Sequence, residues 1–153
     1  MEYLVRTARI TDIERLVGLA GDVLASTEGG SPLGVSDLFR QLVYLPHASI
    51  VVAEARREIA GGGVLVLRPS VRAGGYVGSV DLLVVSPDHD ADRVTTAVLE
   101  ELLRSAQNKG CTVVEAVRPS DPEALARWAA LGFVDAEPLI TRSVVARTAA
   151  RRS

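Results

Sequence analysis

The spacing of apolar residues along the chain predicts both strands and helices. Short β-like runs are expected at residues 3–7, 49–55, 59–67, 76–85 and 112–117, with two closing strands at 133–139 and 140–146. Helical spacing is expected at 11–25, from 36 to Pro46, from 94 to 110, and from Ser120 or Asp121 to Gly132. This order predicts an α/β (α+β) domain whose mixed, mostly antiparallel sheet carries helices on both faces.

Local signals indicate where these elements begin and turn. Thr11 followed by Glu14 forms a capping box, and Ser36 is in position to cap the second helix. The short polar link at 56–58 joins two strand-like runs and predicts an antiparallel hairpin. Three consecutive glycines at 61–63 weaken the second strand of that hairpin. They predict a bulge, or a place where another backbone comes close.

The stretch from 78 to 104 is the one that most suggests chemistry. An apolar strand ends in Ser-Pro, a polar turn DHDADR follows, and an amphipathic helix begins with VTTAVLEELL. A helix that starts directly after a strand leaves its first backbone N–H groups unpaired and aimed at one spot, which suits an anion such as a phosphate. The strand at 112–117 follows this helix, and such a crossover predicts that it lies parallel to the strand before the helix.

Composition narrows the class of protein. The 153 residues, 48% of them hydrophobic, suit one domain at 1–147 with a flexible basic tail at 148–153. A formal net charge of −2, 4% aromatic residues and no apolar run of about 20 residues argue against nucleic acid and membrane partners. Cys111 is the single cysteine, and His47 and His89 stand apart, so no disulfide and no metal site is expected. The N-terminus enters a strand rather than a secretory signal, which favours a cytoplasmic location. The Ala/Val/Arg-rich usage is typical of a bacterial source.

Two local patterns add to the element order. LLVVSP at 82–87 stands before a helix that begins within a few residues, and ALARWAALGF at 124–133 lies near the C-terminus. With the element order, which matches over nearly the whole chain, they resemble the GNAT superfamily of acyl-CoA-dependent N-acetyltransferases. The resemblance implies transfer of an acetyl group from acetyl-CoA to a primary amine by direct attack. The acceptor is expected to be a small-molecule or peptide amine in a pocket shaped by the loops at 26–34 and 68–75. A homodimer is an open option.

The resemblance assigns the coenzyme A pyrophosphate to the turn before the helix. The cofactor-binding positions are then Asp90, Ala91, Asp92, Arg93, Val94, Thr95 and Thr96, with Val84 and Val85 near a strand bulge as donors to the thioester carbonyl. Asp90, Arg93 and Thr95 stand where the family pattern has Gln/Arg, Gly and Gly/Ala. Carboxylates at this turn would repel a diphosphate by about 1 kcal/mol per charge pair in water, and Arg93 would offset part of this. The alternative is that Asp90 or Asp92 caps the helix and occupies its dipole.

Catalytic residues are less clearly marked. Asp81 is the candidate base, because a carboxylate among apolar strand residues becomes a stronger base if it is buried. Alternation along the strand allows the other outcome, a side chain in solvent. Glu54 on the preceding strand is a weaker candidate. Trp128 stands where the family often has the Tyr that reprotonates coenzyme A, and an indole cannot do this, so core packing is the simpler role.

Two hypotheses about function follow from these observations. The chain is an N-acetyltransferase, or it is a catalytically inactive domain of the same fold that has lost coenzyme A binding and serves in binding, regulation or dimerisation. The changed turn positions and Trp128 favour the second hypothesis. An unrelated α/β domain that binds another small ligand would leave the element order unexplained.

Overall fold

The computed structural model describes residues 2–21, 32–136 and 142–143, and its central feature is a five-stranded sheet. The strands follow one another in chain order: β1 (Leu4–Thr7), β2 (Ala48–Ala55), β3 (Glu58–Ser70), β4 (Gly75–Val85) and β5 (Cys111–Ala116). Neighbours pair antiparallel from β1 to β4, whereas β4 and β5 are parallel. The predicted sheet, its hairpin and its one parallel pair are confirmed.

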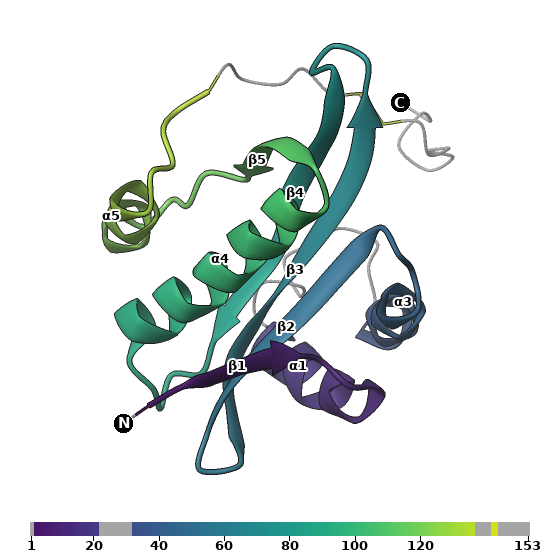
Figure 1. Cartoon of the computed structure of the whole chain (residues 1–153). Helices are drawn as coiled ribbons and strands as arrows, with labels where there is room; N and C mark the ends of the chain where they lie inside the picture. The colour runs from purple at the N-terminus through teal and green to yellow at the C-terminus, as the bar shows by residue number, and fades with distance from the viewer. Residues whose placement is uncertain (1, 22–31, 137–141, 144–153) are drawn as a thin grey trace, which may run out of the picture.

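Helices cover both faces of this sheet (Figure 1). They are the short 3-10 helix η1 (Ile10–Asp12), α1 (Ile13–Leu19), α3 (Pro32–Val43), α4 (Ala91–Asn108) and α5 (Pro122–Ala130). Because side chains alternate along β2, Val51 and Ala53 join the core under α4, whereas Ile50 and Val52 join the core under α1 and α3. Among the described residues, no helix has both the length and the apolarity needed to cross a membrane.

The glycines of β3 allow both layers of helices to approach the sheet closely. A Cβ added to Gly61 would lie 2.5 Å from the carbonyl oxygen of Val84 and 2.6 Å from Cγ1 of Val94 at the start of α4. On the opposite face, a Cβ added to Gly62 would lie 2.6 Å from Cδ2 of Leu16 in α1. The register also shifts here, since Ala53 pairs with Gly61 and Glu54 with Ile59. Both predictions for these glycines, a bulge and a close approach, are therefore confirmed.

The predicted helix caps near the N-terminus are wrong. The first helical turn begins at Ile10, where the carboxylate of Asp12 accepts a hydrogen bond of 2.7 Å from the backbone N–H of Arg9. Arg9 is therefore the N-cap residue, and Asp12 fills the role at the third helical position that the sequence suggested for Glu14. Ser36 lies inside α3 rather than before it, because this helix already begins at Pro32, a residue well suited to a first turn.

The two predicted closing strands are not seen where the structure describes them. Residues 133–136 and 142–143 are in no strand, and the rest of both segments lies outside the described residues, as does the basic tail at 148–153. Phe133 instead packs its ring edge-on against Trp128, with ring centroids 4.9 Å apart. Asp135 forms an ion pair of 3.0 Å with Arg118. These two contacts hold the segment against α5 and the end of β5.

Candidate functional site

The parallel strands β4 and β5 separate part-way along their length. Their pairing runs from Tyr76 with Cys111 to Val80 with Ala116, and β4 then continues without β5 to Val85. The end of β4 leads into α4 and the end of β5 leads into α5 (Figure 1). Among the described residues, the last part of β4 therefore has a strand neighbour, β3, on one side only. In sheets with parallel strands, ligands bind in the crevice outside the carboxyl ends of the strands, which makes this the candidate site.

A bulge in β4 lies at the point where the strands separate. Val64 of β3 pairs with Leu82 and Leu65 pairs with Val80, so Asp81 is the extra residue. The side chain of Asp81 is exposed. Of the two outcomes expected from the sequence, the solvent-facing one is therefore observed.

The bulge expected around Val84 and Val85 is thus found three residues earlier along the strand. Val84 and Val85 pair regularly with Gly62 and Gly61 of β3. Val84 is buried and Val85 is half-buried. Both residues still lie on the part of β4 that β5 does not pair, immediately before the turn into α4.

Asp90 caps α4, as one of the two interpretations of the turn predicted. Its carboxylate accepts a hydrogen bond of 3.2 Å from the backbone N–H of Arg93, and its carbonyl oxygen accepts one of 3.0 Å from that of Val94. The backbone N–H groups of Ala91 and Asp92 belong to the first turn and have no partner within the helix. They are the donors that remain for an anion.

The threonines after this turn differ in their surroundings. Thr95 is buried at 3% exposure among the core residues of α4, whereas Thr96 is half-buried. Thr95 was expected among the phosphate-binding positions, and its burial makes it a core position instead. Thr96 stays a candidate donor.

Asp92 is joined to α5 by an ion pair that local sequence patterns did not reveal. Nε of Arg127 donates a hydrogen bond to the carboxylate of Asp92, although the residues are 35 positions apart. A second carboxylate, that of Glu123, lies 3.7 Å from the same guanidinium. The hydrogen bond to Asp92 raises the pKa of Arg127 above its usual value. The negative charge that Asp92 brings to the mouth of α4 is thereby offset from the neighbouring helix.

The side chain of His89 in the turn is 7% exposed. Its Nδ1 lies 3.2 Å from the hydroxyl of Tyr3, and its Nε2 lies 3.5 Å from the carboxylate of Glu58. The hydroxyl of Tyr3 also accepts a hydrogen bond of 3.3 Å from the backbone N–H of Asp90. The imidazole therefore fixes the turn to the first strand and to the start of β3, and it positions the beginning of α4.

The remaining candidates have structural surroundings. Trp128 is buried at 8% exposure and belongs to the core under α4, which agrees with packing rather than acid catalysis. Glu54 lies 3.2 Å from the guanidinium of Arg6, which also holds Asp12 at 2.8 Å. Burial raises the pKa of the Cys111 thiol, so this residue is a weak nucleophile at neutral pH.

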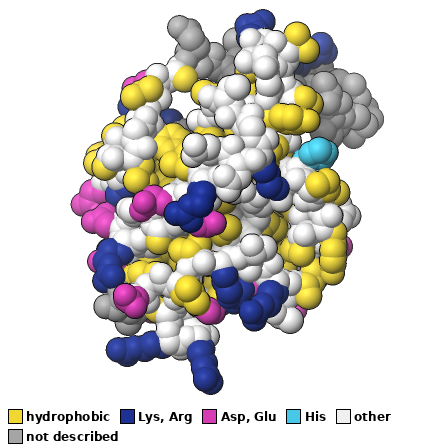
Figure 2. Space-filling view, viewed as in Figure 1, with side chains coloured by type: hydrophobic (Ala, Val, Ile, Leu, Met, Phe, Trp, Pro, Cys, Tyr) yellow, Lys and Arg dark blue, Asp and Glu magenta, His cyan; other side chains and the backbone are white. Residues whose placement is uncertain are grey.

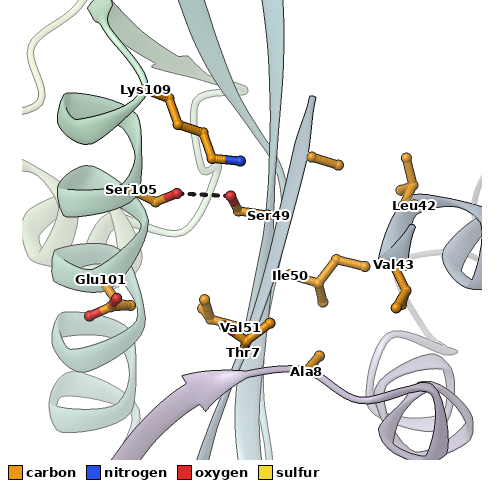
Figure 3. A pocket seen from close by; sticks show the side chains of 11 residues that line it. Thr7, Ala8, Leu42, Val43, Ser49, Ile50, Val51, Glu101, Ser105 and Lys109 are labelled. Carbon is orange, nitrogen blue, oxygen red and sulfur yellow. Dashed lines mark hydrogen bonds between the residues drawn. The ribbon is translucent and has the colours of Figure 1, made fainter. Parts of the chain in front are cut away.

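Two hollows lie at opposite ends of α4. The first, of ≈ 540 Å³, is near its start and is lined by Glu2, Tyr3, Leu4, Glu54, Ala55, Arg56, Arg57 and Arg93. The second, of ≈ 280 Å³, is shown in Figure 3 and lies between α3, β2 and the last turns of α4. Within it, the hydroxyls of Ser49 and Ser105 are 2.8 Å apart, and Nζ of Lys109 donates to the carbonyl oxygen of Pro46 at 3.1 Å. The side chains of Ser49, Ser105 and Lys109 thus already have hydrogen-bond partners within the protein. This second hollow is also remote from the turn before α4.

Comparison with known proteins agrees with this geometry. A sequence model described as the acetyltransferase (GNAT) family matches residues 18–133. The chain belongs to the GNAT acetyltransferase family. Among curated protein sequences, none matches it significantly.

Solved structures share the fold at low sequence identity. A transcriptional regulator from Bacillus halodurans C-125 is 19% identical with a TM-score of 0.79, covering 93% of this chain and 99% of its own. Glucosamine-6-phosphate N-acetyltransferase from Arabidopsis thaliana is 18% identical with a TM-score of 0.73, covering 95% of this chain and 100% of its own. The aminoglycoside N-acetyltransferase AAC(6')-Iy, solved in complex with CoA, is 20% identical with a TM-score of 0.76, covering 93% of this chain and 94% of its own. At these identities the likeness concerns the fold alone.

Proposed function

We propose that this GNAT protein transfers an acetyl group from acetyl-CoA to the primary amine of a small molecule or peptide. The observation that carries the proposal is the separation of β4 from β5 beyond Val80, with the first turn of α4 at the end of the freed strand. This arrangement offers an extended backbone edge next to a helix N-terminus, which suits a long ligand with a phosphate at one end.

The turn residues supply the proposed pyrophosphate site. The backbone N–H groups of Ala91 and Asp92 donate to the phosphates, and the hydroxyl of Thr96 and the guanidinium of Arg93 add to them. The backbone N–H of Arg93 already donates a hydrogen bond to the carboxylate of Asp90. The charge of Asp92 is offset by Arg127. Binding therefore relies on backbone donors and nearby arginines rather than on the glycines that the turn lacks.

The proposed reaction is direct attack of the amine on the thioester. The amine nitrogen bonds to the carbonyl carbon, the carbon–sulfur bond breaks, and the proton lost by the amine ends on the leaving thiolate. Backbone N–H groups near Val84 and Val85 are the proposed donors to the carbonyl oxygen as negative charge develops there. Asp81, exposed where β4 and β5 separate, is the proposed base, acting through water.

A second function is supported by the same turn. Asp90 caps α4 with its own carboxylate, and the contact between Asp92 and Arg127 bridges α4 and α5 across the mouth. Trp128 replaces a proton donor with a buried indole. These features would suit a catalytically inactive GNAT domain that has lost coenzyme A binding and serves in binding, regulation or dimerisation.

Calorimetric titration with acetyl-CoA separates the two functions. The enzyme proposal expects saturable heat and a rise in melting temperature, followed by release of free thiol when a panel of primary amines is added. An Asp81→Asn variant should bind acetyl-CoA as the natural chain does but release thiol more slowly. Absence of both heat and thermal shift at millimolar acetyl-CoA would remove the enzyme and leave the inactive domain.

A further inference from the structure

Three arginines surround the hollow at the start of α4. Arg56 and Arg57 form the tip of the β2–β3 hairpin, and Arg93 lies in the first turn of α4. All three side chains are exposed. Figure 2 shows Lys and Arg side chains projecting at the lower end of the molecule, where Figure 1 places this hairpin. The chain thus presents a concentrated positive charge at one end of its sheet, although its net charge is −2.

In the described part of the chain these arginines have no carboxylate partner. Glu54, which lines the same hollow, is held by Arg6 at 3.2 Å. Glu2 is the other acid of the lining. By contrast, the guanidiniums of Arg6 and Arg127 each contact two carboxylates. Three cations facing one hollow repel one another unless an anion joins them.

The hairpin turn places Arg56 and Arg57 beside the hollow, and an aromatic ring contacts Arg93. Arg56 and Arg57 have φ angles of 53° and 64°, the left-handed region that a two-residue hairpin turn requires and that glycine or asparagine normally fills. The guanidinium of Arg93 lies 5.4 Å from the centre of the Tyr3 ring. Tyr3 is itself held by His89 and by the backbone of Asp90. Two arginines thus occupy a turn that disfavours them, beside a third that is fixed in place.

We propose that Arg56, Arg57 and Arg93 together bind a phosphate group. A guanidinium presents a planar fork of N–H donors that matches two phosphate oxygens, and several such forks around one hollow suit a dianion. The site joins the hairpin tip to Arg93 at the start of α4, and it adjoins the backbone donors that the proposed function assigns to the pyrophosphate. The phosphate belongs either to the acetyl-CoA of the proposed function, as its 3′-phosphate, or to a different phosphorylated small molecule.

Titration with inorganic pyrophosphate tests the site itself and does not depend on the proposed function. The natural chain is compared with an Arg56→Gln/Arg57→Gln double variant, in which glutamine keeps the length of the side chain and removes its charge. Arg72→Gln, in the exposed turn between β3 and β4 at the other end of the sheet, is the matched control. Melting temperatures establish that all three chains are folded.

The proposal expects the double variant to bind pyrophosphate at least tenfold more weakly, with the control unchanged. It is overturned if the natural chain does not bind pyrophosphate at millimolar concentration, or if the double variant binds it as tightly. Equal binding by the double variant would mean that pyrophosphate binds only at the start of α4, and it would leave the proposed function intact.

A second titration identifies the source of the phosphate and rests on the proposed function. The affinities for acetyl-CoA and for its 3′-dephospho form are measured with the natural chain and the double variant. If the 3′-phosphate is the ligand, the natural chain prefers acetyl-CoA severalfold, and the double variant loses that preference. If each chain binds acetyl-CoA and its 3′-dephospho form with equal affinity while the two chains differ in pyrophosphate binding, the arginines bind a separate phosphorylated molecule.

Discussion

Two clusters in this protein are built from the same three groups, one arginine between two carboxylates. Arg6 lies 2.8 Å from Asp12 and 3.2 Å from Glu54, and the side chains of these two acids are 10% and 26% exposed. Arg127 contacts Asp92 and lies 3.7 Å from Glu123, where the two carboxylates are 74% and 83% exposed. The first cluster joins β1, η1 and β2, and the second joins α4 to α5 at the mouth of the candidate site.

The difference between the clusters is solvent. Half-buried charges have lost much of their hydration, so each depends on its partner, and removal of one leaves the others unpaired. Exposed charges keep their water and gain little from pairing. We therefore expect the Arg6 cluster to contribute to stability and the Arg127 cluster to act mainly through the electric field that a bound anion would meet. Three predictions test this division, and a fourth concerns the hairpin arginines.

Replacement of Arg6 should have the largest effect. Arg6→Met should lower the free energy of unfolding by about 2–3 kcal/mol, because the buried Asp12 and the half-buried Glu54 are left without their cation. The matched variant Arg127→Met should lower it by less than about 1 kcal/mol. Urea denaturation of both variants measures the difference. Equal losses would mean that burial does not distinguish the two clusters.

The pH dependence of stability should single out Asp12. The hydrogen bonds from Arg6 hold the pKa of this carboxyl below its usual value. A group whose pKa is lowered by folding contributes stability above its unfolded pKa, about 4, and loses it as the pH falls through the lower folded value. The difference in unfolding free energy between the natural chain and Asp12→Asn should therefore be constant from pH 7 to about 5 and shrink below about 4.

That pH series has a control at the second cluster. At neutral pH, Asp92→Asn should lower the free energy of unfolding by less than about 1 kcal/mol, because its side chain is 74% exposed. A stability difference for Asp12→Asn that persists undiminished to pH 2 would contradict the assigned role of its charge.

Neutralisation of Asp92 should act on binding rather than on stability. Under the proposed function, Asp92→Asn removes a negative charge beside the pyrophosphate and releases Arg127 to face it. Acetyl-CoA should then bind about threefold to tenfold more tightly, or roughly 1 kcal/mol, as measured by calorimetry. Glu123→Gln, in the first turn of α5, should change the affinity less. Weaker binding by Asp92→Asn would show that the bridge to Arg127 shapes the site instead.

Arg56 and Arg57 at the hairpin tip belong to neither cluster. We expect the smallest change in the free energy of unfolding when Arg57 is replaced. Arg57→Gly should raise the free energy of unfolding by up to about 1 kcal/mol, because glycine adopts a positive φ angle without the clash of a Cβ. The same variant should bind pyrophosphate more weakly. A thermal melt and a titration on one sample measure both quantities. Loss of stability in Arg57→Gly would mean that the arginine is held by contacts within the folded chain.

Much of the scaffold follows from local patterns. The apolar runs define the five strands, the short link at 56–58 defines the hairpin, and the crossover through α4 defines the parallel pair. Asp121 caps α5, and Gly132, with a φ angle of 94°, ends it, as the sequence indicated. Such features are predictable because each depends on residues close together in the chain, whose spacing fixes the local backbone.

The details of the site depend on contacts between distant residues. The bulge falls at Asp81 because the register of β3 against β4 places it there. The side chain of His89 is shielded from solvent because Tyr3, 86 residues away, lies beside it. The negative charge of Asp92 is offset because α5 brings the guanidinium of Arg127 to it. The sequence by itself determined a strand, a turn and a helix, with acids where a phosphate would bind. Only the tertiary structure decided which of those acids have partners, because charge at a site is the sum over all elements that meet there.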